Sequence, residues 1–164
     1  MKKSNYSSYL VTIYLILVVW ILLFKMSSFN EIQNLDIHRT INLIPFYIHS
    51  ESGINRADII RNFLVFIPLG IYFMMMNYNF FKAVLYGAAI SIGIEILQFL
   101  FGIGVTDIND MMTNTAGAFA GIIFYFLISI FFKRKETLNH VLQIIATFCT
   151  LILLVFIFIL IYSN

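Results

Sequence analysis

The stretch FFKAVLYGAAISIGIEILQFLF, Phe80–Phe101, decides the fold class of this chain. It is long enough to cross about 30 Å of hydrocarbon as a helix, which takes roughly 20 residues. Its charged residues are Lys82, near the start, and Glu95, near the end. Four more apolar stretches of similar length lie near Tyr9–Phe24, Ile59–Met76, Met111–Phe132 and Leu138–Tyr162. The sequence therefore predicts an all-α, polytopic integral membrane protein with about five transmembrane helices, folded as a single membrane domain over residues 1–164.

The composition excludes several classes of protein. Of the 164 residues, 61% are hydrophobic and 11% are charged, whereas roughly a quarter are charged in soluble domains. A net charge of +2 is too small to indicate nucleic-acid binding. Cys149 is the only cysteine, so it has no disulfide partner within the chain. We expect no cofactor, and the bilayer is the first partner that the sequence indicates.

The second apolar stretch is the least regular of the five. Arg61 and Asn62 lie near its start, and Pro68 lies near its middle. Proline removes one backbone donor and clashes with the preceding turn, so it kinks or breaks many helices. A kinked or re-entrant element is therefore the alternative to a membrane-spanning helix here.

The lysines and arginines of the connections predict the orientation, because cytoplasmic loops are enriched in them. A cytoplasmic N-terminus places six of these residues inside and four outside. The cluster Lys133–Lys135 has the greatest weight, because it is dense and lies directly beside two spans. We expect a protein of the cell membrane with its N-terminus in the cytoplasm and its C-terminus outside.

Glu95 is the most informative polar residue, because an ionised carboxylate at the centre of a membrane helix costs about 2.5 to 3.5 kcal/mol. It lies about six residues before the end of its span, or roughly 9 Å deep. Ser91 and Gln98 are four residues before it and three residues after it, so all three share one face of the helix. That face should point toward protein or water. The structural alternative is that these side chains only join helices by hydrogen bonds.

A second polar stripe begins the fourth span. Asp107, Asp110 and Asn114 are followed, at the same helical spacing, by Gly117 and Gly121. Asp107 has an ordinary explanation as a helix N-cap, whereas Asn114 lies a full turn inside the span. The two glycines form a small-x-x-x-small pattern, for which close helix packing is the preferred interpretation.

With five crossings, the first connection, the start of span two, the end of span three and the start of span four lie at one membrane face. Polar residues from all four can therefore converge, and on the predicted orientation they converge outside. We expect Arg61 and Glu95 to be close partners. The candidate ligand-binding residues are Arg39, Asn42, Arg61, Asn62, Glu95, Gln98, Asp107, Asp110 and Asn114.

Three motifs in this order resemble the VanZ-like family. They are Arg39-x-x-Asn42-Leu43-Ile44-Pro45-Phe46, Arg61-Asn62-x-x-x-Phe66-Ile67-Pro68-Leu69-Gly70, and Glu95-x-x-Gln98 followed by Asp107-Ile108-x-Asp110-x-x-x-Asn114-Thr115-x-Gly117. They place a VanZ-like core at about residues 39–121. The resemblance implies a role in lowering susceptibility to teicoplanin-type lipoglycopeptides at the cell surface.

Three classes of function fit these residues. The first is a non-enzymatic membrane protein whose outward polar pocket engages a lipid headgroup or a lipoglycopeptide. The second is an enzyme acting on a lipid-linked cell-envelope substrate, with Glu95 or Asp110 as general base. The third is a small transporter. No specific metal-binding motif is present, although Glu95, Asp107 and Asp110 could offer oxygen ligands to Mg²⁺ or Ca²⁺.

Overall fold

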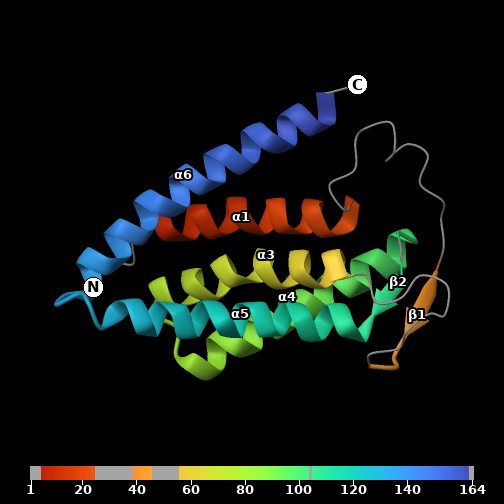
Figure 1. The fold of residues 1–164 in the computed structure, drawn as a ribbon, viewed down its shortest axis with the longest axis horizontal. Coiled ribbons are helices and arrows are strands. Elements are labelled where there is room, and N and C mark those ends of the chain that lie inside the picture. The colour runs from red at the N-terminus through yellow and green to blue at the C-terminus, as the bar shows by residue number, and fades with distance from the viewer. Residues whose placement is uncertain (1–4, 25–38, 46–55, 104, 163–164) are drawn as a thin grey trace.

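Five long helices and one short strand pair make up the part of the chain that the structure describes (Figure 1). The structure is a computed structural model, which describes residues 5–24, 39–45, 56–103 and 105–162. The elements in chain order are α1 (Asn5–Phe24), β1 (Thr40–Asn42), α3 (Arg56–Met75), α4 (Phe80–Phe101), β2 (Val105–Asp107), α5 (Ile108–Ser129) and α6 (Lys135–Tyr162). All five helices in these described ranges are long and apolar enough to cross a membrane. The predicted fold class is confirmed.

The α3 helix is continuous in spite of its proline. It runs from Arg56 to Met75 with Pro68 inside it, and the segment Ala57–Met75 has the length and hydropathy of a membrane span. Neighbouring helices in a membrane protein can compensate for the missing backbone donor of a proline. The structure therefore favours a spanning helix over a re-entrant element.

Among the described helices, α3 and α5 make the closest backbone contact. A Cβ atom built on Gly121 would lie 1.9 Å from the carbonyl oxygen of Ile67, and one on Gly117 would lie 2.2 Å from that of Phe63. From the other side, a Cβ on Gly70 of α3 would lie 2.0 Å from the carbonyl oxygen of Ala118. The glycines therefore let the two backbones touch, which confirms the packing role expected for the α5 pair.

The α1 and α6 helices complete the bundle on one side of α3 and α4. The Tyr14 hydroxyl of α1 donates a hydrogen bond to the Val65 carbonyl of α3, with a distance of 2.9 Å. The Gln143 amide of α6 donates to the Ser7 hydroxyl of α1 at 2.7 Å. Figure 1 shows α6 diverging from the other helices toward its C-terminal end. Most of its surface is therefore left for the lipid.

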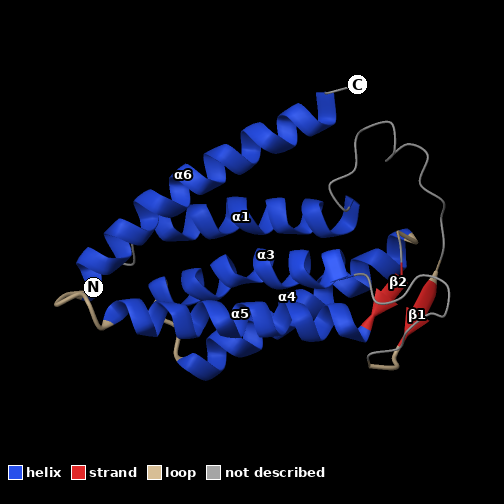
Figure 2. Cartoon of the chain, in the orientation of Figure 1, coloured by secondary structure: helices blue, strands red, loops and turns tan. Residues whose placement is uncertain are grey.

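A two-stranded parallel sheet lies at one end of the bundle (Figure 2). Its register pairs Thr40 with Val105 and Asn42 with Asp107. The sequence did not predict these strands. Gly102 ends α4 in the left-handed conformation, with φ of 65°, and β2 then leads directly into α5. The end of α4, the start of α5 and the start of α3 thus lie together at one end of the bundle, as the alternating crossings predicted (Figure 1).

Candidate functional site

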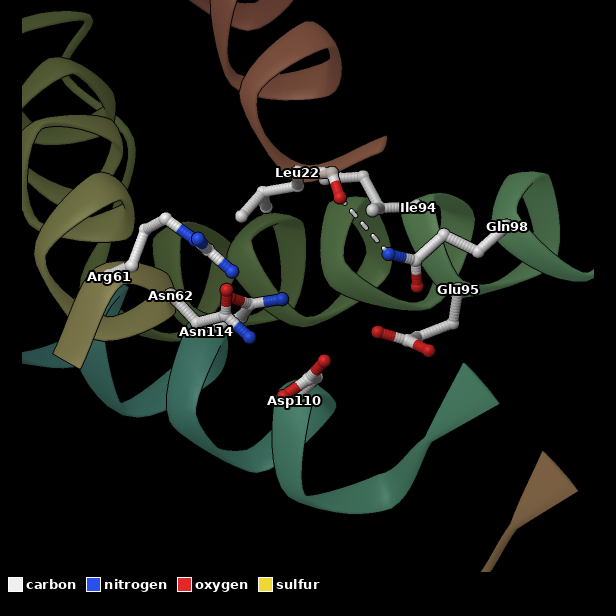
Figure 3. Close-up of a pocket in the computed structure, with 8 residues that line it drawn as sticks. All are labelled: Leu22, Arg61, Asn62, Ile94, Glu95, Gln98, Asp110 and Asn114. Carbon is white, nitrogen blue, oxygen red and sulfur yellow. Dashed lines mark hydrogen bonds between the residues drawn. The ribbon is translucent and has the colours of Figure 1, made fainter. Parts of the chain in front are cut away.

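Polar side chains from three helices enclose a small pocket near this end of the bundle (Figure 3). The cavity has a volume of about 10 Å³, which is room for one group the size of a water molecule. The residues that line it are Leu22, Arg61, Asn62, Ile94, Glu95, Gln98, Asp110 and Asn114. Six of the nine candidate residues are therefore brought together.

Glu95 is held by the junction between β2 and α5. It is only 3% exposed, and its Oε2 atom accepts a hydrogen bond from the backbone N–H of Asp107 at 3.0 Å. The Asp107 carboxylate caps α5 by accepting from the backbone N–H of Asn109 at 2.8 Å. The Asp107 side chain thus caps α5, and the Asp107 backbone N–H orients Glu95. The carboxylates of Glu95 and Asp110 point toward the same space in Figure 3.

Gln98 presents its amide oxygen to the pocket. Its Nε2 atom donates to the Leu22 carbonyl of α1 at 3.2 Å. Because a carbonyl oxygen can only accept, this contact requires the nitrogen of the amide on that side and the oxygen on the other. The Oε1 atom is buried and has no hydrogen-bond partner among the described residues. A buried acceptor left in this state costs free energy unless something else donates to it.

Asn114 is in the same situation. Its Nδ2 atom donates to the Ser91 hydroxyl at 3.1 Å, and that hydroxyl in turn donates to the Met111 carbonyl at 3.4 Å. The only hydroxyl hydrogen of Ser91 is donated to Met111, so Ser91 can only accept a hydrogen bond from Asn114. The nitrogen of the Asn114 amide must therefore face Ser91, and its oxygen faces the other way. Asn114 is 1% exposed, and its Oδ1 atom lacks a partner within the described part of the chain.

Arg61 lies at the more exposed side of the pocket. It forms a salt bridge with Asp58, one turn earlier in α3, and both side chains are about a quarter exposed. Its buried Nε atom has no hydrogen-bond partner in the described ranges. Asp58 was not among the predicted partners of Arg61, although a spacing of three residues in a helix places the two side chains side by side. Arg61 and Glu95 line one pocket, and their direct pairing stays a prediction.

Three candidate residues lie outside the pocket lining: Asp107, which caps α5, and Arg39 and Asn42. The Nη2 atom of Arg39 donates to the Leu100 carbonyl at 3.4 Å on the exposed surface. Asn42 pairs with Asp107 in the strand register, and its side chain accepts from the Ile44 backbone N–H at 3.1 Å. Asn42 therefore belongs to the strand pair beside the site, and Arg39 directly precedes that strand and contacts the end of α4.

The structure gives no support to the metal site considered for Glu95, Asp107 and Asp110. Among residues 5–24, 39–45, 56–103 and 105–162, no group of three His, Cys, Asp or Glu side chains is placed to hold a metal ion. The capping role of the Asp107 carboxylate is one reason, because it is directed toward the first turn of α5.

Comparison with known proteins identifies the family. The profile of the VanZ/LLP1 family matches residues 11–132, a wider range than the motifs alone cover. The chain is similar to Protein VanZ of Enterococcus faecium, with 35% identity over 156 residues that cover 90% of this chain and 89% of the relative. No solved structure matches the chain significantly. With its five spanning helices, the chain therefore belongs to the VanZ/LLP1 family and is a multi-pass membrane protein.

Proposed function

We propose that this protein lowers susceptibility to teicoplanin-type lipoglycopeptides by binding the headgroup of an amphiphile in its polar pocket, without a chemical step. The observation that carries the proposal is the set of three buried polar atoms without partners among the described residues, on Arg61, Gln98 and Asn114. All three belong to residues that line one pocket. Burying a donor or acceptor away from water costs free energy unless a hydrogen-bond partner is present. A bound ligand can supply that partner.

The place of the pocket suits a ligand that is anchored in the bilayer. Glu95 lies six residues before the C-terminal end of α4, so it is about 9 Å below the end of that helix. An amphiphile with its tail in the hydrocarbon holds its headgroup at the interface above this depth, so only a terminal group of the headgroup reaches down to the pocket. Because the cavity is only about 10 Å³, a terminal group of the ligand enters it and the remainder stays at the mouth beside Arg61. On the orientation predicted by charge, that mouth faces outward.

The test removes one charge at a time from the pocket. Glu95→Gln, Asp110→Asn and Arg61→Gln should each abolish protection against teicoplanin in a host that the unaltered protein protects. Glu95→Gln keeps an oxygen that can accept from the Asp107 backbone, so the local fold should persist. The control is Glu136→Gln, which makes the same chemical change in the exposed first turn of α6. Inhibitory concentrations are compared at matched amounts of protein in the membrane.

Two results would contradict the proposal in different ways. If the three pocket variants protect as well as the original, the polar cluster is structural and the binding role fails. If the original protein gives no protection in a host where a resistance protein of this family does, the role in teicoplanin susceptibility fails for this chain.

A further inference from the structure

The pocket is rich in acceptors whose orientation is fixed. The amide oxygens of Gln98 and Asn114 are turned away from Leu22 and Ser91, and both are more than nine-tenths buried. Neither oxygen has a partner among the described residues. The group that completes them must donate at least two hydrogen bonds, so a phosphate or carboxylate, which offers only acceptors, does not fit inside the cavity.

The charges around the cavity favour a cation as that donor. The carboxylates of Glu95 and Asp110 line the same space, and Glu95 is 3% exposed. Opposite charges attract more strongly in such a buried site than in water, so a charged donor gains more than a neutral water molecule. A primary ammonium has about the size of water and carries three N–H donors. A quaternary ammonium has no N–H donor, and its methyl groups exceed a cavity of about 10 Å³.

Arg61 adds the complementary charge at the mouth. Its Nε atom is buried without a partner in the described ranges, and its salt bridge with Asp58 is about a quarter exposed. A guanidinium in this position suits a phosphate or carboxylate oxygen. The pocket and its mouth together therefore match a ligand whose ammonium group is followed, a few bonds later, by an anionic oxygen.

We infer that the pocket binds the primary ammonium group of an amphiphile, with its N–H groups donating to Gln98 Oε1 and Asn114 Oδ1. The inference rests on the proposed function, because it names the chemical group that the same pocket takes. Two sources carry this chemistry at the membrane surface: the ethanolamine headgroup of a phospholipid and a free amino group of a lipoglycopeptide.

The first experiment needs no variant. The full chain, purified in a mild detergent, is mixed with phosphatidylethanolamine, phosphatidylcholine or N-acetylated phosphatidylethanolamine with identical acyl chains, and bound lipid is counted by native mass spectrometry. The three lipids share their phosphate and differ at the nitrogen. The ethanolamine lipid should bind at least about tenfold more tightly than the other two, as expected for charged hydrogen bonds to buried acceptors.

Variants then assign the preference to the pocket. Asn114→Leu and Gln98→Met keep side-chain volume and remove the amide oxygens, and each should reduce the preference to less than about twofold. Asn114→Asp retains an acceptor and should retain the preference, which tests the residue even if Asn114→Leu fails to fold. The control is Thr150→Val, which alters a polar side chain of α6 that is 5% exposed and lies outside the pocket lining.

A second arm tests the other source of the ammonium. The protein in phosphatidylcholine vesicles is titrated with teicoplanin and with teicoplanin acetylated on its amino group. A preference for the free amine in either arm supports the inference and identifies the source. Equal binding of free and blocked amines in both arms overturns it, because the pocket then holds water or an unrelated group.

The outcome is separable from that of the proposed function. If the protein protects cells but binds free and blocked amines equally, the ammonium inference is rejected and the protective role stands. If the protein clearly prefers the free amine but does not protect cells, the ammonium inference stands and the protective role is rejected.

Discussion

Replacing Gly121 by alanine should separate α3 from α5. A Cβ atom at this position would lie 1.9 Å from the carbonyl oxygen of Ile67, whereas ordinary contacts begin near 3.4 Å. The obstacle is backbone, so no side-chain rotation can relieve the clash. The two helices must therefore move apart by about 1.5 Å, and a gap of that size removes much of the dispersion energy between the facing atoms.

The expected cost is about 3 kcal/mol, the upper part of the range for overpacked sites, because the contact on the other side is rigid. This corresponds to a change of roughly 100-fold in the unfolding equilibrium constant. Alanine has the better helix propensity by about 1 kcal/mol, so propensity alone predicts the opposite sign. The sign of the effect therefore distinguishes packing from propensity.

Gly93→Ala is the matched control. A Cβ atom on Gly93, in α4, would meet nothing within 4 Å. The same substitution should therefore leave stability unchanged or raise it slightly. Unfolding of both variants is followed by circular dichroism as sodium dodecyl sulfate is added to mild-detergent micelles. If Gly121→Ala unfolds at the same detergent fraction as Gly93→Ala, the close contact between α3 and α5 does not stabilise the protein.

Three smaller predictions follow from the connections. With Cys149 replaced, an impermeant thiol reagent should label a cysteine at Asn109 in intact cells but not one at Glu136; the reverse pattern refutes the orientation. Asn79→Ala should cost about 1 kcal/mol in unfolding free energy, because its side chain caps α4, and an unchanged transition would refute this. Asn77 has φ of 60°, so Asn77→Val should destabilise the turn while Asn77→Gly does not, as thermal unfolding in detergent can show.

The helices were predictable because one physical signal determines them. A membrane helix needs about 20 apolar residues, and the chain contains five such stretches. Stretch Phe80–Phe101 has the same bounds in the sequence prediction and in the structure. The face of Ser91, Glu95 and Gln98 was also predictable, because helical spacing places them together and charge in hydrocarbon requires them to face inward.

The partners of those side chains were not predictable from spacing. Gln98 donates to a backbone carbonyl 76 residues away in α1, and any residue type could provide that acceptor. The strands β1 and β2 have three residues each, which is too short for an alternating pattern to appear. The two strands pair only because the packing of α4 and α5 places β2 at the end of the bundle, and the local sequence of the strands does not contain this information. Local sequence patterns thus predicted the helices, whereas contacts with backbone groups far away in the sequence could be found only from the structure.

The glycine contact and the polar pocket belong to one arrangement of α3 and α5. Gly117 meets the backbone of Phe63, and the residue before Phe63 is Asn62, which lines the pocket. Asn114 lies one turn before Gly117 on the same face of α5, so the approach of the two backbones also sets the width of the pocket.

Gly121 lies one turn deeper, against Ile67, where the pocket has ended. A substitution at Gly117 should therefore change both the stability and the proposed ligand binding, whereas one at Gly121 should act first on stability. The burial of polar atoms without partners among the described residues is unfavourable by itself, and the close packing of α3 and α5 below the pocket offsets that cost.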